Sequence, residues 1–166
     1  MTKKIDDVDI TILNLLQREG RIKRGDIAKA VNMSIPSVSE RLRKLEKDGY
    51  ILHYTAVLSP QKVGLDMMAF IFIDLESSSF DEDLIKHAQE EPQVLECHAI
   101  TGSGSHVLKV RTPKTVDLQN LLHKIRSWPG VKDTRTSVVL SSAKEHQPLP
   151  LALSTQSRSN RSKKAT

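Results

Sequence analysis

A short stretch of hydroxyl and cationic side chains, residues 34–47, has the composition of a nucleic-acid contact. Ser34 and Ser37 open the stretch, and Arg and Lys side chains follow toward its end. Small side chains let a helix approach base edges in the major groove of DNA, while cations reach the phosphates. The candidate DNA contacts are Ser34, Ser37, Ser39, Arg41, Arg43, Lys44 and Lys47.

These candidates lie on one side of an amphipathic pattern. The opposite side is an apolar stripe formed by Ile35, Val38, Leu42 and Leu45, which predicts a helix with one buried face. Ser37 and Lys44 lie away from that stripe, whereas Ser39 lies near its edge. A solvated surface helix is the alternative interpretation. The compact basic unit around the stretch, with a short helix and a turn before it, favours DNA.

Three predicted helices place the basic stretch in a helix-turn-helix unit. Asp6 is a suitable N-cap, Pro36 is tolerated in a first turn, and Gly49 follows the last helix. Residues 50–59 predict an extended segment, which is either a short wing or a connecting strand. The predicted helices span residues 6–18, 24–31 and 34–48.

The pattern changes near residue 60, where β-branched and aromatic runs begin to alternate with helical segments. Their order predicts a ferredoxin-like βαββαβ domain, with one antiparallel sheet and both helices on one face. The fold class is therefore α+β, with residues 1–60 as the helix-turn-helix domain, 61–142 as the ferredoxin-like domain and 143–166 as a basic, disordered tail. The strands are expected at 67–76, 94–102, 105–112 and 131–140, and the helices at 80–91 and 116–128.

Composition and charge narrow the functional class. Apolar residues make up 38% and charged residues 27%, and no apolar run is long enough for a membrane helix. The net charge of +5 divides into +3 for residues 1–60, −2 for 61–142 and +4 for 143–166. Basic ends favour a polyanionic partner. We expect a cytoplasmic protein without a disulfide, because Cys97 is the only cysteine and no secretory signal opens the chain.

The sequence offers no convincing metal or catalytic site. Cys97, His98 and His106 are close in sequence, but Cys97 and His98 point to opposite faces of a strand. A two-residue turn at 103–104 would place His106 opposite Thr101. Zinc-ligand spacing, phosphate-binding loops and nucleophile elbows are all missing from the sequence. We therefore expect no metal, no cofactor and no enzymatic activity.

Four stretches resemble the Lrp/AsnC family, the leucine-responsive and asparagine-synthetase-regulator type of bacterial and archaeal transcription factors. They are "DDVDITILNLLQREGRI" at 6–22, "SVSERLRKLEKDGYI" at 37–51 with "YTAVLSP" at 54–60, "ECHAITGSGSHVLKVR" at 96–111, and "GVKDTRTSVVL" at 130–140. The resemblance implies a helix-turn-helix domain joined by a strand to a ferredoxin-like domain. That second domain is implied to form homodimers and larger even-numbered assemblies and to bind an amino acid.

The resemblance also implies an effector site near the glycine turn and the last strand. The candidate residues there are Thr101, Gly102, Ser103, Ser105, His106, Thr134 and Thr136. Where the family usually has Gly-Asp-aromatic-Asp-Tyr, this chain has a turn with serine at both acidic positions. A serine offers only a neutral hydrogen bond to a ligand ammonium group, which favours a different ligand or none.

We interpret the chain as an oligomeric, sequence-specific regulator that binds double-stranded DNA, with a small-molecule effector as a possible second partner and no membrane partner. Two alternatives share the fold. One is an enzyme similar to siroheme decarboxylases, which would need histidines and arginines around a tetrapyrrole pocket. The other is a co-regulatory oligomerisation module without DNA binding.

Overall fold

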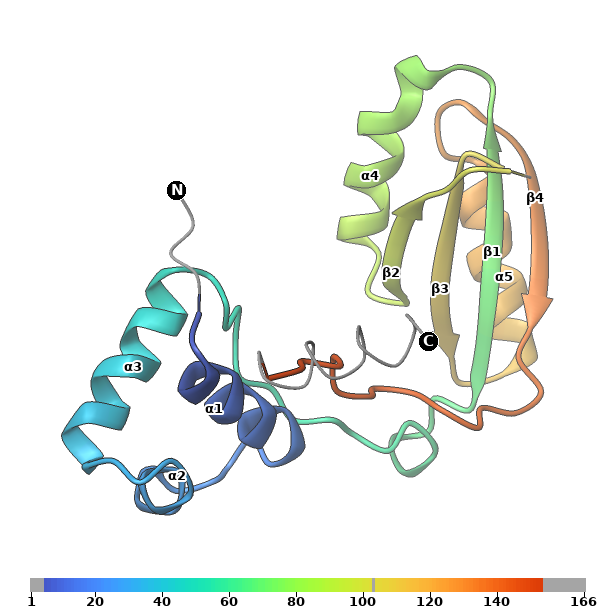
Figure 1. Cartoon of the computed structure of the whole chain (residues 1–166). Helices are drawn as coiled ribbons and strands as arrows, with labels where there is room; N and C mark the ends of the chain where they lie inside the picture. Colours follow the sequence, from blue (N-terminus) through green and yellow to red (C-terminus); the bar gives the residue numbers. More distant parts are fainter. Residues whose placement is uncertain (1–4, 103, 154–166) are drawn as a thin grey trace, which may run out of the picture. The chain divides into compact units, whose positions relative to one another are not determined.

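The chain divides into two compact units, which are described separately. The computed structural model describes residues 5–102 and 104–153. One unit holds the described residues up to Val57 together with those from Lys144 onward, and the other spans Leu58–Ala143 (Figure 1). In the described part of the chain, no helix combines the length and apolarity that crossing a bilayer requires.

The first unit is built on three helices close to their predicted positions: α1 (Asp7–Arg18), α2 (Arg24–Ala30) and α3 (Ile35–Lys47). A capping box starts α1, because the Asp6 carboxylate accepts from the Asp9 N–H and the Asp9 carboxylate accepts from the Asp6 N–H. The helices enclose a small apolar core, whose most buried members are Ile12, Ile27, Val38 and Leu45.

One member of the predicted apolar stripe is not buried. Ile35 is 52% exposed, whereas Val38, Leu42 and Leu45 are at most 5% exposed. Ile35 has the helical spacing of the apolar stripe, but it is the first residue of α3 and lies one turn before the first buried residue of the helix, Val38. It therefore stays outside the core.

Residues 51–59 form no strand in the structure, so neither a wing hairpin nor a paired connecting strand is present in the single described chain. Tyr54 holds part of this connection to α3, because its hydroxyl donates to Glu46 Oε1 at 2.9 Å. Partial burial, together with the Glu46 hydrogen bond and charge, raises the pKa of Tyr54 to about 12, so the phenol remains a donor at neutral pH.

The second unit is an antiparallel four-stranded sheet with two helices on one face, as predicted. Sequence order gives β1 (Met67–Leu75), α4 (Asp81–Glu90), β2 (Val94–Ala99), β3 (His106–Thr112), α5 (Thr115–Arg126) and β4 (Val131–Val138), with short 3-10 helices η1 (Gln61–Val63) and η2 (Ser78–Phe80). The spatial order is β2-β3-β1-β4 (Figure 1). Side chains of α4 and α5, such as Leu84 and Ile125, pack with Ile71 and Leu108 of the sheet.

The hairpin between β2 and β3 differs from the prediction. His106 pairs with Ala99 rather than with Thr101; β2 ends at Ala99 rather than at 102, and β3 begins at His106 rather than at 105. The Ile100 N–H donates to the Ser105 carbonyl, so more than the two predicted turn residues lie between the last hydrogen-bonded pair. His98 is opposite Val107, and Cys97 is opposite Leu108, so Cys97 and His98 do lie on opposite faces.

The segment that follows β4 returns to the first unit. We predicted disorder from residue 143, but residues 144–153 have a defined position and Leu151 packs against the core of the three helices. Residues 154–166 lie outside the described residues.

Candidate nucleic-acid interface and ligand site

The start of α3 presents two hydroxyl groups. Ser34 is the N-cap, and its Oγ accepts from the Ser37 N–H at 3.3 Å and lies 2.8 Å from the Ser37 Oγ. Ser34 is exposed and Ser37 half-buried. This first turn therefore has short polar side chains beside the positive end of the helix dipole, an arrangement that suits an approach to bases and phosphates.

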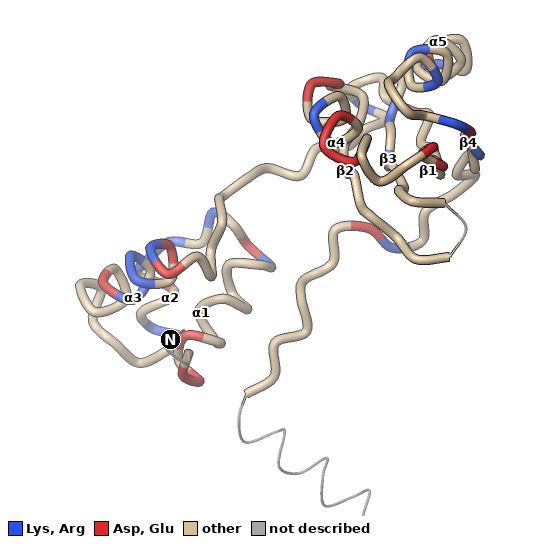
Figure 2. The backbone as a smooth tube through the Cα atoms, turned by 90° about the horizontal axis from the view of Figure 1, so that it is seen from above, with Lys and Arg blue, Asp and Glu red and all other residues tan. Residues whose placement is uncertain are grey.

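The outward face of α3 carries three exposed cations, of which two share one exposed carboxylate. Arg43 bonds Glu40 at 2.9 Å and Lys44 lies 3.7 Å from the same carboxylate, with side chains 69% and 60% exposed. Lys47 is exposed and makes no ion pair within residues 5–102 and 104–153. Figure 2 shows both charge signs along α3. Solvent screens exposed pairs of this kind, so phosphates can displace Glu40 at little energetic cost.

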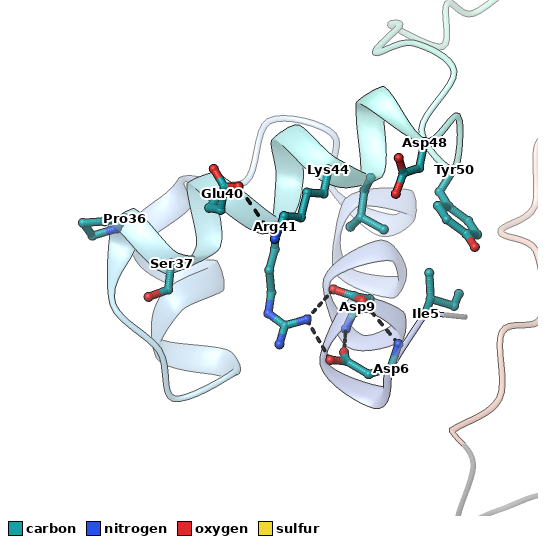
Figure 3. Close-up of a pocket in the computed structure, with 11 residues that line it drawn as sticks. Ile5, Asp6, Asp9, Pro36, Ser37, Glu40, Arg41, Lys44, Asp48 and Tyr50 are labelled. Atoms are coloured by element: carbon teal, nitrogen blue, oxygen red, sulfur yellow. Dashed lines mark hydrogen bonds and ion pairs between the residues drawn. The ribbon is translucent and has the colours of Figure 1, made fainter. Parts of the chain in front are cut away.

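Arg41 occupies a different environment from the one the sequence suggested. Its Nη1 donates to Asp6 Oδ2 at 2.8 Å and to Asp9 Oδ1 at 2.7 Å, so the guanidinium points toward the start of α1 (Figure 3). Only 29% of its side chain is exposed. The hydrogen bonds to Asp9 and then Asp6 raise the pKa of Arg41 further, which keeps it cationic. Arg41 therefore ties α3 to the capping box of α1.

The same contacts change the acidity of Asp6. Partial burial opposes ionisation of this carboxyl, but the Asp9 N–H and the Arg41 guanidinium together outweigh it and lower the pKa of Asp6. A pocket of about 600 Å³ lies beside this ion pair (Figure 3). Its lining includes Ser37, Lys44 and Tyr50.

Ser39 lies on the other flank of α3, where Arg24 is a contact that sequence reasoning missed. The Arg24 Nη1 lies 3.4 Å from the Ser39 Oγ. Arg24 is exposed at the first position of α2, so the structure places a further cation beside α3. The run of basic residues at 21, 23 and 24 was the sequence signal that could have identified it.

The predicted effector residues gather only in part, at one end of the sheet. His106 and Thr134 flank Ile73 of β1 from the neighbouring strands, and both are less than 10% exposed. Ser105 lies beside them, with its Oγ 3.1 Å from the His106 Nδ1 and donating to the Ile73 carbonyl at the same distance. Thr136 is half-buried one position further along the same face of β4.

The remaining effector candidates belong to the turn. Thr101 and Gly102 are exposed, and Ser103 lies outside the described residues. Gly104 has a φ of +107°, and a Cβ there would lie 3.2 Å from the Ile73 carbonyl oxygen, so the turn requires glycine at this position.

Arg126 is a second residue that sequence reasoning missed. It lies in the last turn of α5, and its Nε donates to the Thr134 Oγ1 at 3.0 Å. A guanidinium next to the buried Thr134 hydroxyl can pair with a ligand carboxylate. The short connection between α5 and β4 was the available signal, because it brings the end of one element beside the next.

Within the described ranges, no group of three metal-ligating side chains comes together. Burial raises the pKa of the Cys97 thiol, so it stays protonated and unreactive at neutral pH.

Two family models cover most of the chain. Residues 5–51 match the model described as winged helix-turn-helix DNA-binding, and residues 68–149 match the Lrp/AsnC ligand binding domain. The first match contains all three helices of the first unit, and the second contains nearly the whole sheet.

Similar proteins are regulators. The HTH-type transcriptional regulator FL11 of Pyrococcus horikoshii is 32% identical, over 91% of this chain and 99% of its own length. The leucine-responsive regulatory protein of Escherichia coli K12 is 36% identical, over 86% of this chain and 89% of its own. The transcriptional regulator NMB0573 of Neisseria meningitidis, solved in complex with L-Met, has a TM-score of 0.84 and 32% identity, and the match covers 89% of this chain and 97% of that one. The chain belongs to the Lrp/AsnC family of transcriptional regulators.

Proposed function

We propose that this regulator reads duplex DNA in the cytoplasm through the outward face of α3. The observation that carries the proposal is the pairing of a small hydroxyl-bearing first turn, Ser34 and Ser37, with the exposed cations Arg43, Lys44 and Lys47 further along the same helix. The hydroxyls suit close approach to base edges, and the cations suit the flanking phosphates.

Arg41 takes a supporting role in this proposal. Its two carboxylate partners hold the start of α1 against the middle of α3, so Arg41 fixes the angle of the recognition helix. Ser39 is kept as a weaker candidate, because it is half-buried and lies beside Arg24.

We infer that the active form is a homodimer or a larger even-numbered assembly. The face of the sheet without helices carries the half-buried Phe70 and Phe72 of β1, and the connection before the sheet exposes Leu52 and Val57. Two copies related by a two-fold axis would present two α3 helices to pseudo-palindromic half-sites. Light scattering after size exclusion, with a monomer mass as the contradicting result, tests the assembly.

DNA binding is tested with the triple variant R43A/K44A/K47A, in fluorescence anisotropy titrations against duplexes selected from a random pool. Affinity at low salt should fall at least about tenfold, and the slope of log affinity against log salt should fall by about 0.9 for each phosphate that the variant no longer neutralises. The matched control K62A/K86A/K132A removes three exposed lysines of the second unit and should leave both quantities unchanged.

Glu40 supplies a variant with the opposite sign. Glu40→Gln removes the carboxylate that Arg43 and Lys44 share, so binding should tighten about threefold. An unchanged affinity and salt slope in the triple variant would refute the assignment of α3, whereas a wild-type protein that binds no duplex would favour an oligomerisation module without DNA binding.

We also propose that an amino acid binds at the end of the sheet where His106 and Thr134 flank Ile73, with Ser105 beside His106 and Arg126 beside Thr134. The ligand-domain match and the L-Met complex of the Neisseria relative support an amino-acid ligand, and Arg126 supplies a partner for its carboxylate.

The amino-acid site is tested by thermal unfolding. Trp128, the only tryptophan, is buried in the second unit and reports the unfolding of that unit by fluorescence. An L-amino acid ligand should raise the melting temperature of the wild type and not that of Arg126→Ala; no stabilisation by any L-amino acid would refute this site.

A further inference from the structure

One large aliphatic side chain of α3 is exposed at the start of the helix. Ile35 is 52% exposed, whereas Val38, the next member of the same apolar stripe, is 0% exposed. The neighbouring helix α2 faces Ile35 with Gly25, which has no side chain, and a Cβ at that position would lie 3.9 Å from the Ile35 Cδ1. The glycine therefore helps to leave about half of the isoleucine open to contact with another molecule.

Ile35 lies at the end of α3 that the proposed function directs to the bases. It is the first residue of the helix and follows the exposed N-cap Ser34. Each Cα–Cβ bond of a helix tilts toward the N-terminus, so a side chain at the first position projects beyond the helix end. Pro36 and Ser37 follow at the same end (Figure 3). In helix-turn-helix proteins the N-terminal residues of the recognition helix contact base edges, which is where Ile35 would lie.

An isoleucine side chain can recognise only one group on the base edges of the major groove. It has no donor or acceptor, and the C5 methyl group of thymine is the one apolar group that the four bases present there. Contact between two apolar groups is favourable because it removes both from water, whereas covering a donor or acceptor with isoleucine costs hydrogen bonds. Ile35 should therefore favour thymine at the base pair that it faces.

A cation on the same side of α3 suits a phosphate next to that base pair. Arg24, the first residue of α2, is exposed, and its Nη1 lies 3.4 Å from the Ser39 Oγ. Ser39 follows Ile35 by four residues, so the two lie on the same side of the helix. A phosphate contact by Arg24 would fix the register of α3 on the duplex and would itself carry no sequence information.

We propose that Ile35 is a specificity-determining residue of this regulator and reads the C5 methyl group of one thymine in each half-site. The proposal rests on the proposed function, because it assigns a base to a residue of the DNA-binding helix. The hydroxyl groups of Ser34 and Ser37 can bond to more than one base, so Ile35 adds discrimination that these hydroxyl groups do not supply.

Deoxyuridine tests the contact at the level of one methyl group, because it differs from thymidine only in lacking that group. Each thymine of a duplex selected from a random pool is replaced in turn, and binding of the full-length protein is measured by fluorescence anisotropy. One replacement in each half-site should weaken wild-type binding about threefold to fourfold, the effect of burying one methyl group. In Ile35→Ala the same replacement should change the affinity by less than about 1.5-fold, because the coupling between the two groups is lost.

Two further variants control for the effect of the substitution itself. Ile35→Val keeps a branched side chain and should show an intermediate loss with deoxyuridine, and it provides the same test if Ile35→Ala fails to fold. Val116→Ala shortens a side chain of similar exposure, 56%, in the first turn of α5, and should bind both duplexes as the wild type does. Far-UV circular dichroism shows whether each variant is folded.

The outcomes distinguish this proposal from the one on α3. Equal losses with deoxyuridine in the wild type and in Ile35→Ala would overturn the role of Ile35, and so would a wild type that is insensitive to every replacement. If R43A/K44A/K47A still weakens binding in either case, the α3 assignment stands. A wild type that binds no duplex would contradict the proposed function itself.

Discussion

The two flanks of α3 carry the same side chain in two environments. Arg41 is 29% exposed and bonds two carboxylates at the start of α1, whereas Arg43, two residues later, is 69% exposed and bonds only Glu40 of its own helix. Both arginines form ion pairs, but the two ion pairs connect different parts of the structure. The Arg41 pair joins two helices, and the Arg43 pair joins two neighbours on one surface.

This difference supports the proposed distinction between an arginine that positions α3 and an arginine that contacts DNA. The Arg41 guanidinium is bonded to both carboxylates of the α1 capping box, so releasing it leaves these two carboxylates without their cationic partner. A guanidinium on an exposed i,i+3 pair can exchange its partner for a phosphate at little cost. The arginines of α3 therefore differ in what they join: Arg41 connects two helices, and Arg43 stays on the exposed face that we propose for DNA.

The largest expected effect is on stability. Arg41→Ala should lower the free energy of unfolding of the first unit by about 1–2 kcal/mol, because it removes two charge-assisted hydrogen bonds from a partly exposed site. Arg43→Ala, the same change on the same helix, should leave the stability close to that of the wild type and weaken DNA binding instead. Urea unfolding followed by circular dichroism at 222 nm measures the loss of stability.

The fluorescence of Trp128 provides an internal control in the same experiment, because this residue belongs to the core of the second unit and should report an unchanged transition. Arg41→Lys should recover part of the stability, since a single nitrogen, Nη1, makes both bonds. Equal losses in Arg41→Ala and Arg43→Ala would contradict the distinction between the two flanks.

The helices and strands could be predicted because their signals are local. Asp6 and Asp9 stand three residues apart before an apolar stripe, and the structure forms a capping box with them. Runs rich in β-branched and aromatic residues, such as residues 67–76, identified β1 to within a residue. These features depend only on residues that are close in the sequence, so the sequence alone is enough to predict them.

The partners of Arg41, the position of Ile35 and the binding of Leu151 could not be predicted in the same way. Arg41 meets Asp6 across 35 residues, and Asn14 meets Leu151 across 137. The helical wheel places Arg41 between the buried and the exposed face of α3, but only the packing of α1 brings Asp6 and Asp9 to that position. The predicted register of the β2–β3 hairpin was wrong for a related reason, because two glycines at 102 and 104 allow more than one turn length.

The smallest expected effect is a pH dependence that belongs to the Arg41 flank. The pKa of Asp6 in the folded protein lies below its ordinary value of 3.8, so the folded state binds fewer protons than the unfolded chain in this range. The resulting stabilisation is complete above the ordinary pKa and is lost as the pH falls through the folded pKa. In Arg41→Ala part of this shift disappears, so the difference in melting temperature between wild type and variant should be constant from about pH 7 to about pH 5 and narrow toward about pH 3.

Lys47→Ala is the matched control for this pH dependence, because it removes an exposed cation of the same helix that has no ion pair in the described part of the chain. Its melting temperature should differ little from that of the wild type, and the difference should not change with pH. A difference for Arg41→Ala that stays constant down to about pH 3 would mean that Arg41 stabilises α3 by packing of its aliphatic stem and not through its charge on Asp6.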